Sequence, residues 1–129
     1  MEPLILDASV LIGLLDTEDS HHDRAVDEID QADRADHQLL TPASAYSEAL
    51  IAFARAGRVN DAREAITGMG ITVVGLTAPI GERSAELRAR HDSLRLPDAL
   101  VLATAHEHDG VLLTYDERLA RTARQRRKR

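Results

Sequence analysis

The chain has 129 residues, a formal net charge of −6 and no cysteine. A domain of this length buries about two-thirds of its unfolded surface, so it needs no disulfide or structural metal to fold. The lack of cysteine excludes thiolate metal sites and thiol nucleophiles. No apolar stretch reaches the roughly 18 residues of a membrane span, and no secretory signal is visible, so we expect a cytoplasmic protein without a membrane partner.

The first half of the chain alternates short apolar runs with helical patterns. Residues 4–6 predict a buried strand, followed by a short apolar helix over 8–16. Asp19 and Ser20 are suited to cap a second helix, with apolar positions at helical spacing on one face. Residues 37–41 predict the second strand, and Pro42 favours the start of a helix over 43–57.

The second half continues the alternation. A helix is expected over 59–70, a β-branched strand over 71–76, and an amphipathic helix over 77–91. The segment 98–108 is apolar nearly all round, which is typical of a buried helix. Residues 111–114 predict the last strand, before a polar final helix. Because strands alternate with helices and no hairpin signal appears, we expect an α/β fold: a three-layer α/β/α sandwich with a central parallel sheet of four to five strands.

Charge is concentrated at the C-terminal end. Residues 117–129 hold seven basic side chains and one acid, a net charge of +6, so the rest of the chain carries −12. We therefore expect a domain over 1–120 and a basic tail over 121–129. The tail is either a solvated end of the chain or a phosphate-binding arm, and charge alone does not decide between the two.

Acidic side chains follow two of the predicted strands. Asp7 comes directly after residues 4–6, and Asp116 comes shortly after the last strand. Ligands of open parallel sheets bind beyond the carboxyl ends of the strands, so neighbouring strands would bring these two acids together. Asp98 in a first helical turn and Glu48 on a helix of small residues are further candidates, because an isolated acid on an apolar helix is costly to bury unless it is paired or bound to metal.

Each acid also has an ordinary structural interpretation. Asp7 and Asp116 could cap helices, Asp98 is favoured by a helix dipole, and Glu48 could face solvent. Four such coincidences at one edge of one sheet weaken these interpretations together. Clustered carboxylates suit Mg²⁺ or Mn²⁺, which would hold a phosphate and activate water. Ser9 and Thr114 could bond the carboxylates or a metal-bound water, or serve only as capping and strand-end hydroxyls.

Four segments in this order and spacing resemble the acidic motifs of PIN-domain ribonucleases, and more narrowly the VapC toxins: "LILDASVLIGLLD", "SAYSEAL", "LPDALVLATA" and "VLLTYDERL". The resemblance implies cleavage of RNA that depends on Mg²⁺ or Mn²⁺, homodimerisation, and inhibition by an antitoxin. It places the metal-binding acids at Asp7, Glu48, Asp98 and Asp116, and the supporting hydroxyls at Ser9 and Thr114. The chain departs from many relatives with Tyr115 before the last acid, and with a basic end where a further strand often follows.

Two other classes of protein remain as alternatives. A phosphoryl-accepting receiver domain also carries acids at strand ends, but it needs a lysine at a late strand end, and the only lysine here is Lys128. A non-catalytic PIN-like module that binds RNA or protein would be marked by the loss of acids, and all four are present. Arg95 is either a surface arginine or a contact for a substrate phosphate.

Overall fold

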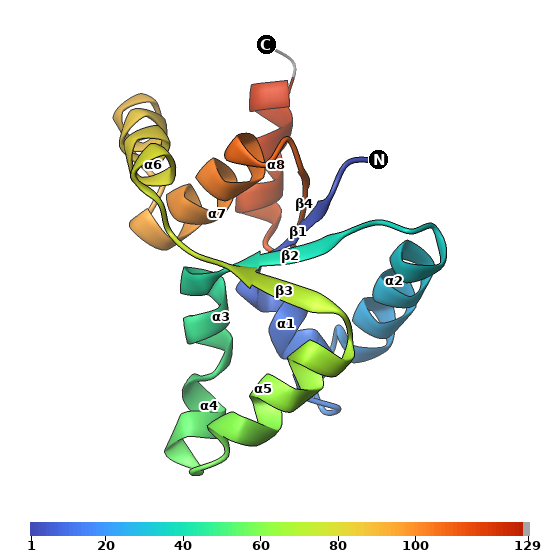
Figure 1. The fold of residues 1–129 in the computed structure, drawn as a ribbon. Coiled ribbons are helices and arrows are strands. Elements are labelled where there is room, and N and C mark those ends of the chain that lie inside the picture. The colour runs from blue at the N-terminus through green and yellow to red at the C-terminus, as the bar shows by residue number, and fades with distance from the viewer. Residues whose placement is uncertain (128–129) are drawn as a thin grey trace.

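The computed structural model describes residues 1–127 and the side chains of residues 1–125. Four strands in this range form one parallel sheet of order β3-β2-β1-β4 (Figure 1). The strands are β1 (Leu4–Leu6), β2 (Leu39–Pro42), β3 (Ile71–Val74) and β4 (Val111–Leu113). Leu4 pairs with Val111 in the register of β1 and β4, so the first and last strands are neighbours. The predicted parallel α/β/α sandwich is confirmed, with four strands.

Helices cover both faces of the sheet. In chain order they are α1 (Ala8–Leu15), α2 (His22–Arg34), α3 (Ala43–Ala49), α4 (Ile51–Arg55), α5 (Val59–Gly68), α6 (Ala78–Arg90), α7 (Leu96–Glu107) and α8 (Glu117–Arg127). The single helix expected over 43–57 is therefore wrong, because the chain forms two helices separated at Leu50. The Leu50 amide is shared between the carbonyls of Tyr46 (3.1 Å) and Ser47 (3.2 Å), which tightens this turn and lets the buried Leu50 side chain join the core.

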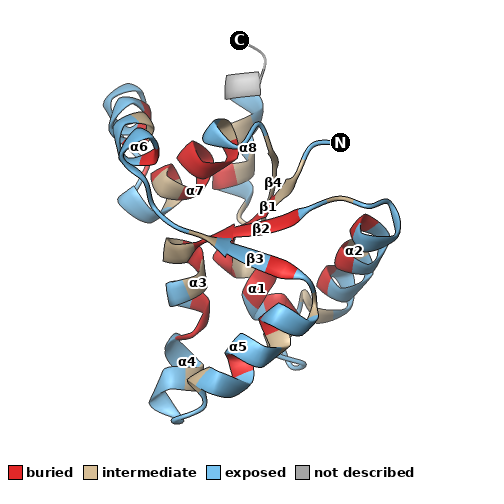
Figure 2. Ribbon diagram, viewed as in Figure 1, coloured by how far each residue is buried: buried red, intermediate tan, exposed pale blue. Residues whose placement is uncertain are grey.

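Adjacent residues of β1 point to opposite faces of the sheet. Leu6 packs with α1, α2 and α5, whereas Ile5 packs with Leu40 and with Ala105 of α7. The side chains of Ile5 and Leu6 are both fully buried, and each contributes roughly 1.5–3 kcal/mol to folding. Figure 2 shows the result: buried residues line the helix surfaces that face the sheet, and α7 is buried along most of its length, as its apolar sequence predicts.

Gly110 fixes the approach of β4 to β1. A Cβ atom at this position would lie 2.7 Å from Cγ1 of Ile5 and 3.0 Å from the carbonyl oxygen of Pro3. Only glycine therefore lets the chain pass from α7 into β4 at this distance from β1. The position of β4 matters because its carboxyl end leads to Thr114 and Asp116.

The basic C-terminal segment begins inside a helix. The expected boundary after residue 120 falls within α8, which runs unbroken from Glu117 to Arg127. Leu119 is buried, and Ala123 packs against the cluster formed by α6 and α7. Residues 128–129 lie outside the described residues, and a role of the tail in phosphate binding stays a prediction. Among the helices of residues 1–127, none has the length and apolar character that crossing a membrane requires.

Candidate active site

The four predicted acids lie along the carboxyl edge of the sheet. Asp7 follows β1, and Asp116 lies three residues after β4. Glu48 belongs to α3, which begins where β2 ends, and Asp98 lies in the first turn of α7. Electrostatic interactions connect Asp98 with Asp7 and Asp116, and Glu48 with Asp7 and Asp98. The four carboxylates therefore face a common region.

The carboxylate of Asp7 is directed into this region and does not cap α1. Asp7 occupies the N-cap position with extended backbone angles, but its side chain accepts no bond from the helix. Its main-chain carbonyl serves the first turn instead, accepting from the amides of Val10 (3.1 Å) and Leu11 (3.2 Å). The buried carboxylate, 8% exposed, accepts at Oδ2 from the hydroxyls of Thr114 (2.7 Å) and Ser9 (3.2 Å).

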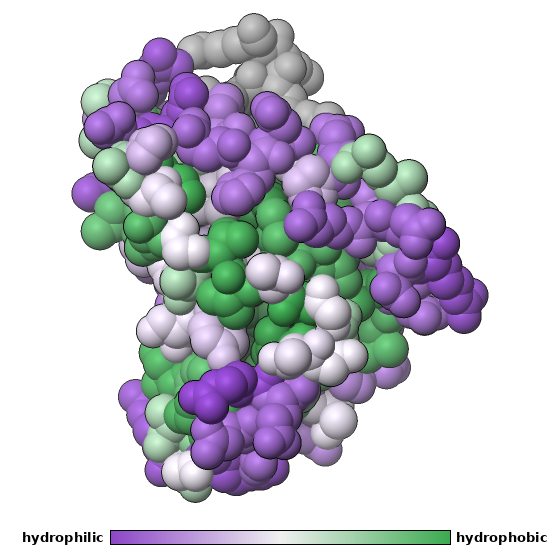
Figure 3. Space-filling view, viewed as in Figure 1, coloured by the Kyte–Doolittle hydropathy of each residue, from purple (hydrophilic) through white to green (hydrophobic). Residues whose placement is uncertain are grey.

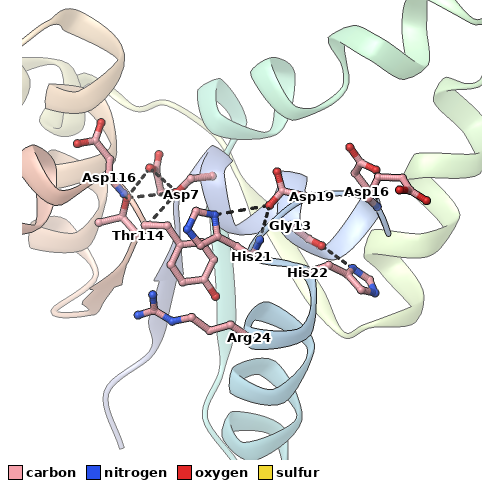
Figure 4. A network of polar contacts seen from close by, with 12 residues as sticks. Asp7, Gly13, Asp16, Asp19, His21, His22, Arg24, Thr114 and Asp116 are labelled. Atoms are coloured by element: carbon pink, nitrogen blue, oxygen red, sulfur yellow. Dashed lines mark hydrogen bonds and ion pairs between the residues drawn. The ribbon is translucent and has the colours of Figure 1, made fainter.

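Ser9 and Thr114 form a small network around Asp7 (Figure 4). Their hydroxyl oxygens lie 3.3 Å apart. The amide of Tyr115 donates to Ser9 Oγ (3.0 Å), and the amide of Asp116 donates to Thr114 Oγ1 (3.1 Å). Because backbone amides approach both oxygens, the single proton of each hydroxyl is left for an acceptor such as Asp7. The end of β4 thereby holds the carboxylate that follows β1.

Asp116 performs the capping role that the sequence left open. Its Oδ1 atom accepts from the amides of Arg118 (2.9 Å) and Leu119 (3.1 Å) in the first turn of α8. The same carboxylate acts on Asp98 electrostatically. Capping therefore fixes the orientation of an acid that also faces the shared region.

Burial and mutual repulsion act on two of the acids. Partial burial raises the pKa of Glu48, Asp7 and Asp98 raise it further, and Arg95 opposes them. Burial likewise raises the pKa of Asp98, where Arg95 lowers it and Asp116 and Asp7 raise it. Both carboxyls therefore hold a proton more readily than in water, as expected for like charges that share one region.

The acids stand apart from one another in this structure. Within residues 1–127, no group of three or more histidine, aspartate and glutamate side chains converges closely enough to hold a metal ion as it stands. The cationic neighbour of Asp98 is Arg95, whose Nε lies 3.8 Å from Asp98 Oδ2. The Arg95 side chain is 76% exposed, so this long ion pair is weak, contributing about 1 kcal/mol or less.

Two features of the site were missed by the sequence interpretation. Arg118 also lowers the pKa of Asp98, and with Arg95 it lines a small groove beside Asp98 and Asp116. The position of Arg118, two residues after an acid at a strand end, was the available signal. The second feature is Tyr115, whose ring packs toward α2 and whose pKa is raised by burial and by a hydrogen bond to Glu28.

These features define a parallel α/β/α domain with an acidic site at the carboxyl edge of its sheet. The family model described as PIN domain matches residues 4–125, nearly the whole chain. The chain belongs to the PIN-domain family. Among curated protein sequences, none matches the chain.

Two solved structures are similar in fold. One is a toxin–antitoxin complex from Klebsiella pneumoniae, with a TM-score of 0.70 and 23% identity over 88% of this chain and 86% of that one. The other is Mycobacterium tuberculosis VapC20, a toxin that cleaves the sarcin–ricin loop, with a TM-score of 0.68 and 19% identity over 91% of this chain and 92% of that one. At these identities the likeness shows a shared fold.

Proposed function

We propose that this PIN-domain protein is a VapC-type toxin, an endoribonuclease that depends on Mg²⁺ or Mn²⁺ and acts in the cytoplasm. The observation that carries the proposal is the placement of Asp7. The nearly buried carboxylate of Asp7 does not cap α1, although it stands at the N-cap position. Ser9 and Thr114 hold it instead toward three further acids. A helix cap or a solvent-facing acid has no need of this arrangement.

The donor set fits a hard divalent cation. Asp7, Glu48, Asp98 and Asp116 offer only carboxylate oxygens, the ligands that Mg²⁺ and Mn²⁺ prefer. The raised pKa values of Glu48 and Asp98 are consistent with a site whose charge a cation would balance. A bound ion would polarise the scissile phosphate and lower the pKa of a water molecule.

The protein's own residues would orient the acids and the substrate. Ser9 and Thr114 hold Oδ2 of Asp7, and the cap of α8 holds Oδ1 of Asp116. Arg95 and Arg118 flank the acids and would bind phosphates next to the scissile one. Water would attack the phosphorus in line and break its bond to the 3′-oxygen, which leaves a 5′-phosphate and a 3′-hydroxyl.

A groove beside the site supports an antitoxin partner. It lies between α1 and the α3–α4 segment, has a volume of about 240 Å³, and is lined by Glu48 and by apolar side chains that include Ile12 and Ile51. These two isoleucines are 38% and 47% exposed. An antitoxin segment that is apolar and carries one arginine would fill the groove and pair its guanidinium with Glu48. It would thereby replace the cation and block the substrate.

A homodimer is the second proposed assembly. Figure 3 shows apolar surface over the middle of the molecule, where β3 lies, between the hydrophilic surfaces of the outer helices. Val73 and Leu76, on β3 and just after it, are 38% and 48% exposed. Exposed apolar side chains at a sheet edge are typical of surfaces that associate. Light scattering of the purified protein measures the assembly directly.

RNA cleavage by the purified protein tests the proposed function. The parent protein should cut a structured RNA in Mn²⁺ and not in EDTA, and sequencing of the cut ends should find 5′-phosphates. Co-purification with a protein encoded next to it, and loss of cleavage in that complex, tests the antitoxin. The alternative is a non-catalytic PIN-like module that binds RNA or protein. RNA binding without cleavage in any divalent ion would favour it.

A further inference from the structure

Tyr115 lies between two residues of the proposed site, but its side chain points away from the acids. Its neighbours Thr114 and Asp116 contribute a hydroxyl and a carboxylate to the carboxyl edge of the sheet. The Tyr115 ring packs instead against the core cluster on the side of α1 and α2. The segment that follows β4 is therefore held from both sides, by the site and by α2.

Three side chains from α2 and the turn before it enclose the ring. The Tyr115 hydroxyl donates to Glu28 Oε1 at 2.5 Å. The guanidinium carbon of Arg24 lies 4.5 Å from the ring centroid, and Arg24 Nε lies 3.3 Å from the same oxygen of Glu28. The His21 ring stacks on Tyr115 with centroids 4.7 Å apart and an interplanar angle of 20°.

The stacking histidine is itself tied to its own turn. The His21 amide donates to Asp19 Oδ2 (3.0 Å), and its Nδ1 lies 3.6 Å from the same oxygen. Figure 4 shows Asp19 bonded to His21 on the side of this histidine that faces away from Asp7 and Thr114 in the view. A stack, a cation–π contact and a charge-assisted hydrogen bond thus act on one ring, and each restricts a different motion of that ring.

The backbone of Tyr115 connects this anchor to Asp7. Its amide donates to Ser9 Oγ (3.0 Å), which requires that the Ser9 proton point elsewhere, toward Asp7 Oδ2 or Thr114 Oγ1. A shift of Tyr115 would release Ser9, displace Thr114 from Asp7, and move Asp116 at the start of α8. A misplacement of 1 Å can lower a catalytic rate by about a hundredfold. Loss of this anchor would therefore have a measurable effect on cleavage.

We propose that Tyr115 is a positioning residue, and that its anchorage to Glu28, Arg24 and His21 sets the geometry of Asp7 and Asp116. The inference rests on the proposed function and adds α2 to the elements that control the site. Tyr115 contacts neither the metal nor RNA in this account. It acts through Ser9 and through its neighbours in the chain.

Two variants break the hydrogen bond of the anchor while sparing the acids, and both leave the ring stacked on His21. Tyr115→Phe keeps the ring and removes the hydroxyl, and Glu28→Ala removes its acceptor. Glu28→Gln is the conservative variant, because its amide oxygen can still accept the phenol proton. Asp30→Ala is the matched control, since it breaks an exposed ion pair of the same spacing on the same helix, with Arg34 Nη2 3.0 Å from Asp30 Oδ2.

The experiment measures cleavage kinetics in Mn²⁺ and, by electron paramagnetic resonance, the Mn²⁺ dissociation constant without RNA. Tyr115→Phe and Glu28→Ala should lower kcat by about tenfold or more, leave KM within about twofold, and weaken Mn²⁺ binding. Glu28→Gln should recover most of kcat, and Asp30→Ala should match the parent. Melting temperatures would separate these effects from loss of the folded state.

Three results would overturn the inference in different ways. If the parent cleaves RNA, and Tyr115→Phe and Glu28→Ala keep both its kcat and its Mn²⁺ affinity, the anchorage of Tyr115 to Glu28 does not set the geometry of the site, so the inference fails and the proposed function stands. If the parent neither cleaves RNA nor binds Mn²⁺, the proposed function fails and takes this inference with it. A rise in KM alone would also contradict the proposal, because it would make the cluster a contact for RNA.

Discussion

The ends of β1 and β4 are alike in sequence and different in what their aspartates do. After β1 come Asp7 and then Ser9 in the first turn of α1, and after β4 come Thr114 and Asp116 before α8 begins at Glu117. Asp116 accepts from the amides of its own helix α8. Asp7 accepts from Thr114, 107 positions away, and from Ser9.

The difference follows from the pairing of the two strands. Because β1 and β4 are neighbours, Thr114 lies beside Asp7 and offers it a short hydrogen bond that the backbone of α1 would otherwise have to supply. Asp116 has no such partner among the described side chains and takes the local cap. An acid at a strand end can therefore belong to the site with or without capping its helix, and a hydroxyl that follows the adjacent strand decides whether it caps.

The largest expected effect is at Asp7. Asp7→Asn keeps the shape of the side chain and an acceptor for one hydroxyl, but removes the charge that would bind the cation. A bound metal supplies several kcal/mol of transition-state stabilisation, and ~1.4 kcal/mol is tenfold in rate, so cleavage should fall by about a hundredfold or more. The circular dichroism spectrum should not change. Asp33→Asn on the exposed side of α2 is the control, and parental cleavage by the Asp7 variant would exclude Asp7 from the site.

Two substitutions of Asp116 separate its two roles. Asparagine is also a good N-cap, so Asp116→Asn should lose cleavage and keep the stability of α8. Asp116→Ala should lose cleavage and also about 0.5–2 kcal/mol of unfolding free energy, because the amides of Arg118 and Leu119 lose their acceptor. Urea denaturation measures the difference. Equal stability of the two variants would mean that the cap contributes nothing.

Burial of the acids and repulsion among them should appear as pH-dependent stability. Burial and the neighbouring acids raise the pKa of Asp98 above its usual value of 3.8 in the folded protein. Its contribution to stability is therefore fully present below that value and is lost as pH rises through the higher folded pKa. Asp98→Asn does not ionise, so in EDTA it should melt a few degrees above the parent at pH 7 and lose this advantage toward pH 4. A difference that does not change with pH would argue against a raised pKa of Asp98, whether from burial or from repulsion.

The smallest expected effect concerns the arginines around and beyond the acids. Truncation after Ala120 would remove Ala123 from its contacts with α7, so substitutions that remove only charge are the better test. Replacing Arg121 and Arg124 by glutamine should weaken RNA binding slightly and flatten its dependence on salt, by about 0.7 in the log–log slope for each lost phosphate contact with a single strand. An unchanged slope would mean that this part of α8 does not contact RNA.

The rest of the expected tail is tested in the same way. The full set of basic side chains assigned to it comprises Arg121, Arg124, Arg126, Arg127, Lys128 and Arg129. Glutamine is introduced at the last four of these positions, alone and together with the substitutions of Arg121 and Arg124. Comparing the salt dependence of RNA binding among these variants would show whether the start or the end of the segment contacts phosphates. If neither part changes the salt dependence of RNA binding, the basic segment is a solvated end of the chain or a surface for the antitoxin.

The sequence predicted the sheet well because its strands are short and apolar, and its central strands β1 and β2 are largely buried. It gave the adjacency of β1 and β4 only as the condition under which Asp7 and Asp116 would meet, and the pairing of Leu6 with Leu113 shows that this condition holds. It did not predict the interruption at Leu50, because the local sequence there is helical throughout. Burial of Leu50 against distant elements decides that turn.

The site was predictable as a set of acids, but not in the division of labour between them. Whether Asp7 caps a helix depends on a hydroxyl from the other end of the chain, which no local pattern contains. The anchor of Tyr115 is a similar case, because Glu28 lies 87 positions away in the sequence. In both instances the deciding contact is a single hydrogen bond between segments that only the folded sheet brings together.

The most direct test of the central claim, that the four acids form one metal site, is a Mn²⁺ titration of the parent and of four single variants without RNA. Asp7→Asn, Glu48→Gln, Asp98→Asn and Asp116→Asn each remove one charge at nearly constant shape. The account predicts that the parent binds Mn²⁺ and that each of the four variants binds it more weakly, while Asp33→Asn binds it as the parent does. Equal affinity in the parent and all four variants, or a parent that binds no Mn²⁺, would contradict it.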